Sequence, residues 1–120
     1  MMDLPEALRA SVAKMGLTNP TPIQAQAIPH ALNGRDVMGL AQTGTGKTAA
    51  FGIPLIARLM EEGARAAPTT ARGLILAPTR ELAGQIATVL RGLTDMKVQI
   101  VVGGVSINPQ IQRLSKGVDI

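Results

Sequence analysis

The sequence predicts an α/β fold, in which a parallel sheet carries helices on both faces. Short apolar runs typical of buried strands alternate with longer segments of helical periodicity. The connections between these runs are as long as the crossovers that parallel strands require. A glycine-rich stretch separates the first run from the next helix, at the place where a helix N-terminus can bind an anion.

Two capped helices are expected before the first strand. The first begins near Asp3 and Glu6, which resemble a capping box. The second begins at Thr21, with Gln24 in the capping-box position. Pro29 interrupts its pattern, so the segment up to residue 32 predicts either one helix or two short ones.

Three buried strands are expected in the rest of the chain, at residues 37–41, 73–77 and 97–102. The connecting helices are expected at about 48–62 and over the apolar face from Leu82 to Leu93, and a short helix follows at about 109–116. Residues 118–120 resemble the start of a fourth strand. Because a natural domain seldom ends on an unpaired apolar half-strand, we expect the sequence to be truncated at its C-terminus.

Composition excludes several classes of function. The chain of 120 residues has room for one domain at most, and it contains no cysteine, which excludes disulfides and thiolate chemistry. Its one histidine, His30, excludes a two-histidine zinc motif, and its one aromatic residue, Phe51, excludes nucleic-acid binding by stacking bases on aromatic side chains. The net charge of +4 favours polyanionic partners. With no signal peptide or membrane-spanning stretch in the sequence, we expect a cytoplasmic protein without membrane contact.

Residues 41–48, AQTGTGKT, form the strongest motif, although alanine replaces the first glycine of the phosphate-binding loop pattern. Glycines without a Cβ let successive backbone N–H groups turn toward one phosphate. The lysine offers a charge to the β- and γ-phosphates, and the following threonine hydroxyl can ligate Mg²⁺. A chance glycine-rich turn is disfavoured by the strand before it and the helix after it. The motif predicts a nucleotide site at Ala41, Gln42, Thr43, Gly44, Thr45, Gly46, Lys47 and Thr48, with catalytic roles for Lys47 and Thr48 and a metal-binding role for Thr48.

Three other motifs each have two interpretations. Gln24 can act as a capping-box residue only, or its amide can grip adenine N6 and N7. Residues 78–83, PTRELA, can be an ordinary turn into a helix, or their threonine and arginine can contact phosphate. Gly103 and Gly104 can simply turn the chain, or they can expose backbone N–H groups to a phosphate chain.

The order of these motifs resembles that of the DEAD-box RNA helicase family. PTPIQ at 20–24 resembles the family's Q motif, AQTGTGKT at 41–48 its motif I, PTRELA at 78–83 its motif Ia, and the paired glycines its GG element. The resemblance implies a RecA-like P-loop fold and the first RecA-like domain of an ATP-dependent RNA helicase, which uses ATP and Mg²⁺. It divides the chain into an N-terminal helical segment with the Q motif, residues 1–34, and a partial RecA-like domain, residues 35–120.

The same resemblance implies roles for individual residues. In the family the glutamine and threonine of the Q motif read adenine, which gives that role to Gln24 and Thr21. Motif Ia and the GG element contact the RNA backbone with little sequence specificity. This implies RNA binding by Pro78, Thr79, Arg80, Gly103 and Gly104.

The sequence also departs from the family pattern. Leu17 stands where the family usually has phenylalanine, and the aromatic residue that helps to hold adenine has no counterpart. The TPGR, DEAD and SAT motifs and the second RecA-like domain are not in these 120 residues, so the chain alone is expected to be inactive. A non-catalytic P-loop module that binds nucleotide or RNA is the alternative, whereas the Q motif argues against a DNA-directed relative. The sequence identifies no protein partner.

Overall fold

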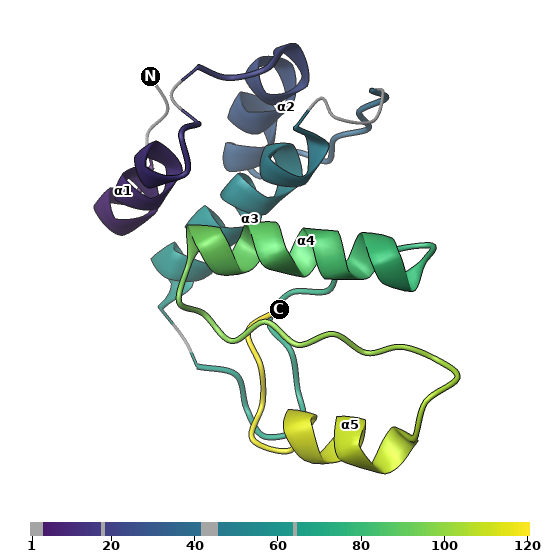
Figure 1. Cartoon of the computed structure of the whole chain (residues 1–120). Coiled ribbons are helices and arrows are strands. Elements are labelled where there is room, and N and C mark those ends of the chain that lie inside the picture. Colours follow the sequence, from purple (N-terminus) through teal and green to yellow (C-terminus); the bar gives the residue numbers. More distant parts are fainter. Residues whose placement is uncertain (1–3, 18, 42–45, 64) are drawn as a thin grey trace.

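The computed structural model describes residues 4–17, 19–41, 46–63 and 65–120. Helices account for about half of this part of the chain, and extended segments connect them (Figure 1). Within the described residues no helix is both long enough and apolar enough to cross a membrane. The helices are α1 (Glu6–Lys14), α2 (Pro22–Leu32), α3 (Lys47–Glu62), α4 (Arg80–Leu93) and α5 (Ile107–Leu114).

The helix boundaries agree closely with the sequence pattern. Helix α2 begins after its N-cap, Thr21, and continues through Pro29, so one helix forms rather than two. Pro29 removes one backbone hydrogen bond, but it and Ala25, whose carbonyl is freed, are both exposed, so water can take the place of that bond. Helix α5 begins two residues before its expected start. The expected capping residue Asp3 lies outside the described residues.

The hydrophobic core lies among the first four helices. Helix α3 packs against α1, α2 and α4, and α1 also contacts α4. Each of these helices contributes at least one fully buried side chain, and burial of each such side chain stabilises the fold by about 1.5–3 kcal/mol. The largest of them are Leu8, Ile28, Ile56, Leu90 and Leu93.

The segments expected as strands are extended, but no regular strand is present in the described part of the chain. Residues 118–120 lie between two of them. Val118 forms a parallel bridge with Ala71, and the backbone of residues 119–120 hydrogen-bonds to Lys97 and Gln99 on the other side. Beyond these few bonds the neighbouring segments separate, and a strand cannot form without a paired neighbour. The expected strands at 73–77 and 97–102 are therefore present as extended chain that pairs with residues 119–120 only at Gly73, Lys97 and Gln99.

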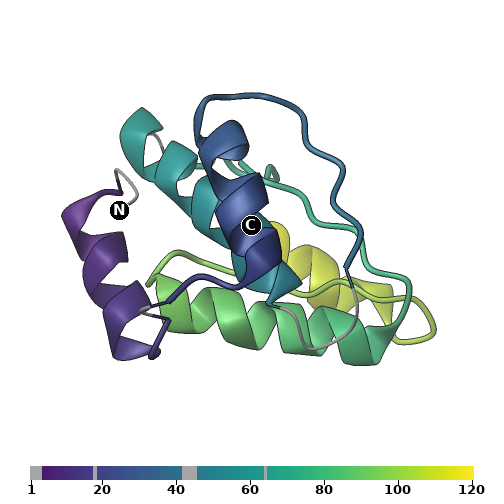
Figure 2. The same ribbon diagram turned by 90° about the horizontal axis from the view of Figure 1, so that it is seen from above.

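Residues 37–41 differ most from expectation. Met38 and Leu40 are each 91% exposed, so the prediction of a buried strand here is wrong for this structure. Figure 2 shows the chain leaving the end of α2 and running apart from the helices before it returns toward the start of α3. The segment is apolar enough for a core strand, but no other extended segment in the described part pairs with it.

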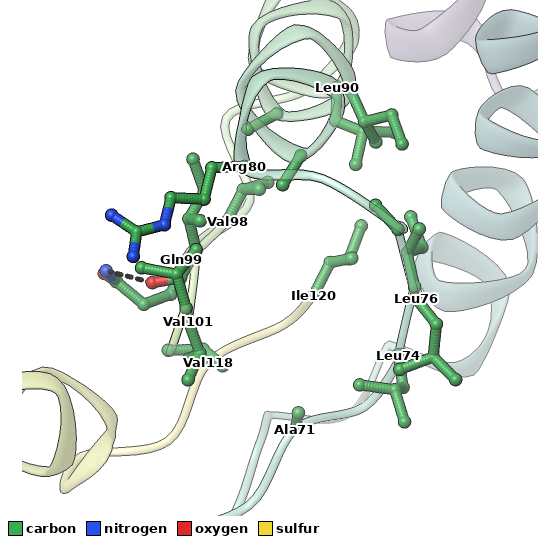
Figure 3. A pocket seen from close by; sticks show the side chains of 18 of the residues that line it. Ala71, Leu74, Leu76, Arg80, Leu90, Val98, Gln99, Val101, Val118 and Ile120 are labelled. Atoms are coloured by element: carbon green, nitrogen blue, oxygen red, sulfur yellow. Dashed lines mark hydrogen bonds between the residues drawn. The ribbon is translucent and has the colours of Figure 1, made fainter. Parts of the chain in front are cut away.

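An open apolar groove of about 560 Å³ separates residues 73–78 from residues 98–103. Figure 3 shows Leu74 and Leu76 on one wall, Val98 and Val101 on the other, and Ile120 between them. Next to these segments in sequence, Arg72 forms an ion pair of 3.3 Å with Asp119. The Asp119 carboxylate also accepts a hydrogen bond of 2.8 Å from the Lys97 backbone N–H.

Candidate functional site

Gln24 links the N-terminus of α2 to the start of α3. Its side chain is 3% exposed, which is unusual for a glutamine and requires hydrogen-bond partners. The Oε1 atom accepts from the Thr21 backbone N–H at 3.1 Å, as the capping-box interpretation predicts. The Nε2 atom donates to the Gly46 carbonyl, also at 3.1 Å. The amide therefore caps its own helix and contacts the glycine-rich loop in the same conformation.

Gly46 could not be replaced by another residue without disturbing this contact. It is the N-cap of α3 and has a left-handed conformation with φ of +81°. A Cβ atom at Gly46 would collide with Gln24 Nε2 and lie 3.2 Å from Thr21 Oγ1. The glycine is thus required both by its backbone angle and by the side chains that the second helix places against it.

Lys47 and Thr48, the residues with predicted catalytic roles, are the first two of α3. Lys47 is exposed and Thr48 is half-buried. The first turn of a helix presents backbone N–H groups without intrahelical partners and the positive end of the helix dipole, a combination that favours phosphate. Ala41, at the start of the loop in sequence, is half-buried. The next four residues, Gln42, Thr43, Gly44 and Thr45, lie outside the described residues.

The Thr21 hydroxyl faces the Gln24 backbone N–H as the other half of the capping box, but it has no well-formed hydrogen bond. It is buried, and no donor or acceptor among the described residues meets it at full hydrogen-bond geometry. Burying a hydroxyl without a partner costs about 1–3 kcal/mol. A ligand that offers a donor or acceptor beside Thr21 and Gln24 would remove this cost. The residues present therefore fit a nucleotide base at this position and its phosphates at the first turn of α3.

The second predicted group, around motif Ia and the paired glycines, is also brought together. Thr79 is the N-cap of α4, and its hydroxyl accepts from the Leu82 backbone N–H at 3.1 Å. Arg80 Nη2 donates to the Gly103 carbonyl at 2.7 Å. Two segments more than 20 residues apart in sequence thus meet at the N-terminus of α4. Pro78 lies directly before the N-cap and is exposed.

Gln110 supports the paired glycines, a role that no sequence pattern indicates. It is 5% exposed on α5, where it accepts from the Val102 backbone N–H at 2.8 Å and donates to the Ser106 carbonyl at 3.1 Å. The turn that contains Gly103 and Gly104 is therefore fixed on both flanks. A glutamine on a short amphipathic helix is normally an exposed residue, so only the tertiary contacts identify it.

The structure does not add a protein metal site to these two groups. Among the described residues no cluster of three histidine, cysteine, aspartate or glutamate side chains could hold a metal ion. A metal at Thr48 would therefore be held by this hydroxyl together with ligand oxygens and water, which is the usual way in which Mg²⁺ binds with nucleotide phosphates.

Known proteins are similar to this chain in sequence and in overall fold. The ATP-dependent rRNA helicase rrp3 of Emericella nidulans is 51% identical over 105 residues, which are 85% of this chain and 22% of the relative. The crystal structure of a DEAD box protein from the hyperthermophile Methanococcus jannaschii matches 98% of this chain and 32% of its own, with a TM-score of 0.83 and 35% identity. The RNA helicase Prp28 from Chaetomium thermophilum, bound to ADP, matches 95% and 28%, with a TM-score of 0.76 and 42% identity.

These relatives are much longer than the chain, which spans less than a third of the length of each. The model of the DEAD/DEAH box helicase family matches residues 21–120, from the N-cap of α2 to the last residue. The matched range includes both groups of site residues described above. On this match, the chain belongs to the DEAD/DEAH box helicase family.

Proposed function

We propose that this chain supplies ATP-binding and RNA-binding elements of an ATP-dependent RNA helicase. The observation that carries the proposal is the hydrogen bond from Gln24 to Gly46, because it joins the predicted base-reading residue to the residue before Lys47. Thr21 and Gln24 would contact adenine, and the loop from Ala41 to Thr48 would hold the phosphates. Thr48 would ligate Mg²⁺, which would neutralise phosphate charge when bound.

RNA would pass along the N-terminus of α4 and the turn beside it. The contact between Arg80 and Gly103 supports this path, because it aligns the N-terminus of α4 with a glycine turn. Backbone N–H groups and a guanidinium bind phosphates rather than bases, so the contact would be largely independent of RNA sequence. The proposed RNA-contacting residues are Pro78, Thr79, Arg80, Gly103 and Gly104.

The proposal extends to the organisation of the chain. Residues 1–34 would carry the Q motif, and residues 35–120 would be part of a RecA-like domain. Its extended segments would pair as a parallel sheet with helices on both faces, which the parallel bridge between Ala71 and Val118 supports. Unwinding would require catalytic groups that the resemblance assigns to other motifs, so this chain alone would turn over no ATP. The cysteine-free composition supports the cytoplasm as its compartment.

The nucleotide site is tested by Lys47→Ala, compared with Lys14→Ala. Both lysines are exposed, but Lys14 lies at the end of α1 and not at the candidate site. We expect Lys47→Ala to abolish binding of Mg-ATP and ADP in calorimetry, because Lys47 is the one full charge that the loop offers, and Lys14→Ala to leave it unchanged. Equal affinity in the two variants would contradict the proposed site.

An ATPase measurement on the intact protein distinguishes a helicase from a non-catalytic P-loop module. The intact protein should hydrolyse ATP faster when RNA is added, and Lys47→Ala should remove this activity. Nucleotide binding without any RNA-stimulated turnover would favour the binding module instead.

A further inference from the structure

We propose that Arg80 is a positioning residue, which acts on RNA by fixing the turn at Gly103 and Gly104 and not mainly as a phosphate contact of its own. The structural part of this proposal concerns the turn alone. Its consequence for RNA rests on the proposed function. The two parts are tested by separate measurements below.

The first support is the contact itself. Arg80 is the first residue of α4, and its Nη2 donates to the Gly103 carbonyl at 2.7 Å. A hydrogen bond from a charged donor at this length is stronger than one between neutral groups. It is a long-range bond, so neither the helix nor the turn could make it alone. The positively charged guanidinium is thus directed at a carbonyl of the turn.

The second support is the space around the two glycines, which differs between them. Gly104 has a left-handed φ of +77°, and a Cβ atom there would collide with Arg80 Nη2. A Cβ atom at Gly103 would meet nothing within 4 Å. The Arg80 side chain therefore fills the space that a Cβ atom would need at Gly104, and it leaves the space beside Gly103 empty. This packing indicates a fitted contact between the side chain and the turn.

The third support is the pattern of bonds that flank the turn. Gln110 holds the residues on either side, through the Val102 backbone N–H and the Ser106 carbonyl. Between these anchors the two glycines are the most freely rotating residues of the segment. Among the described residues, Arg80 is the side chain that bonds to the turn between the anchors. Without it, the backbone groups of the glycines would not be held in one orientation for an anion.

A matched control lies on the same helix. Arg91 Nη2 donates to the Val98 carbonyl at 2.8 Å, so it also links α4 to the segment before the turn by one exposed bond. Its partner, Val98, lies four residues before Val102, the residue that Gln110 holds at the start of the turn. Arg91 has no hydrogen bond to either glycine. Arg91→Ala therefore removes the same charge and the same kind of bond while leaving the turn itself intact.

Amide exchange of this chain tests the structural part without RNA. In Arg80→Ala we expect the Val102 amide, which has a hydrogen-bond partner at the edge of the turn, to exchange about five- to tenfold faster, as expected for loss of one charged hydrogen bond from the turn. In Arg91→Ala the Val102 amide should exchange at the wild-type rate. Unchanged exchange in Arg80→Ala, or an equal increase in both variants, would overturn the proposal whether or not the protein binds RNA.

RNA affinity of the intact protein tests the consequence. Arg80→Ala should weaken binding about tenfold at every salt concentration, with an unchanged slope of log affinity against log salt. Loss of a direct phosphate contact would instead reduce the magnitude of that slope by about 1. Gly104→Ala should weaken binding more in the wild type than in the Arg80→Ala background, because the collision is then absent and only the cost of the left-handed backbone angle remains. A reduced slope or additive effects would overturn the positioning role, whereas absence of RNA binding by the wild type would contradict the proposed function and not the turn contact.

Discussion

The side chain of Gln24 donates a hydrogen bond of 3.1 Å to the carbonyl of Gly46, 22 residues further along the chain. The same amide accepts from the backbone of Thr21, so one side chain serves as helix cap and as contact to the loop. The capping role that the sequence predicted for Gln24 is present, and it leaves room for the adenine contact, which stays a prediction. The amide still has one N–H donor and one oxygen lone pair that could bind a ligand.

Substitutions at Gln24 separate the cap from the loop contact. Glutamate can still accept from Thr21, but it cannot donate to Gly46, whereas alanine loses both bonds. We expect Gln24→Glu to lose about 1–2 kcal/mol of unfolding free energy, because the Gly46 carbonyl is left without its donor. Urea unfolding measures this loss. If the cap alone mattered, Gln24→Glu would be as stable as the wild type.

The same position should control nucleotide preference. A paired contact to a base contributes about 1–3 kcal/mol of discrimination, so Gln24→Ala should bring the ATP and GTP affinities closer in competition experiments. Gln26→Ala is the control, because Gln26 is exposed on the same helix. Lower stability with preserved ATP preference would show that Gln24 has a structural role only.

The local features of this region could be predicted because they depend on neighbours in sequence. The Thr21 cap, the start of α2 and the first turn of α3 follow from capping residues, proline and glycine placement. The bond from Gln24 to Gly46 could not be predicted, since it depends on how α2 packs on α3. The sequence identified the correct residue types at both ends but not their contact.

Gly46→Ala should be more damaging than the same change at Gly63. Both glycines have left-handed backbones at the two ends of α3, with φ of +81° and +62°. A Cβ atom at Gly63 meets nothing within 4 Å, whereas at Gly46 it collides with Gln24. We expect Gly63→Ala to cost about 1–2 kcal/mol for its backbone angle alone. Gly46→Ala should lower the unfolding free energy by at least about 1 kcal/mol more, and it should weaken ATP binding. Equal losses of unfolding free energy in urea would show that a Cβ atom at Gly46 does not collide with Gln24.

The ion pair between Arg72 and Asp119 should stabilise the chain far more than the pair between Arg58 and Glu62. The first pair is 11% and 23% exposed, and the second, at 3.6 Å on α3, is 68% and 52% exposed. Asp119→Asn should lower the unfolding free energy by about 2–3 kcal/mol, because Arg72 loses its charged partner in a mostly buried site. Glu62→Gln should lower it by less than about 1 kcal/mol. A similar loss in the two variants would show that burial of the first pair has no effect.

The extended segments show where sequence reasoning reached its limit. Apolar runs at 37–41 and 73–77 predict buried strands, because side chains of this kind normally lie in a core. A pattern gives the tendency to form a strand, but pairing needs a neighbour at the right distance. In the structure residues 73–77 keep the alternation of a strand: Ile75 packs on the core, whereas Leu74 and Leu76 are exposed.

This alternation gives a test of the proposed sheet, with adjacent residues as probe and control. In this chain Leu76 is 85% exposed, so Leu76→Lys should change the unfolding free energy by no more than about 0.5 kcal/mol. Ile75→Lys should cost about 3 kcal/mol or more, because it places a charge against the core. Equal losses in this chain would show that the alternation is absent.

In the intact protein the outcome for Leu76 should differ. If the extended segments pair as a parallel sheet there, a neighbouring strand and its side chains cover Leu76, and Leu76→Lys should then cost about 2 kcal/mol or more. The measurement is urea unfolding of the same substitution in both lengths of protein, with Ile75→Lys destabilising both. A lysine at position 76 that is harmless in the intact protein would mean that residues 73–77 stay open to solvent, and the parallel sheet would have to be abandoned.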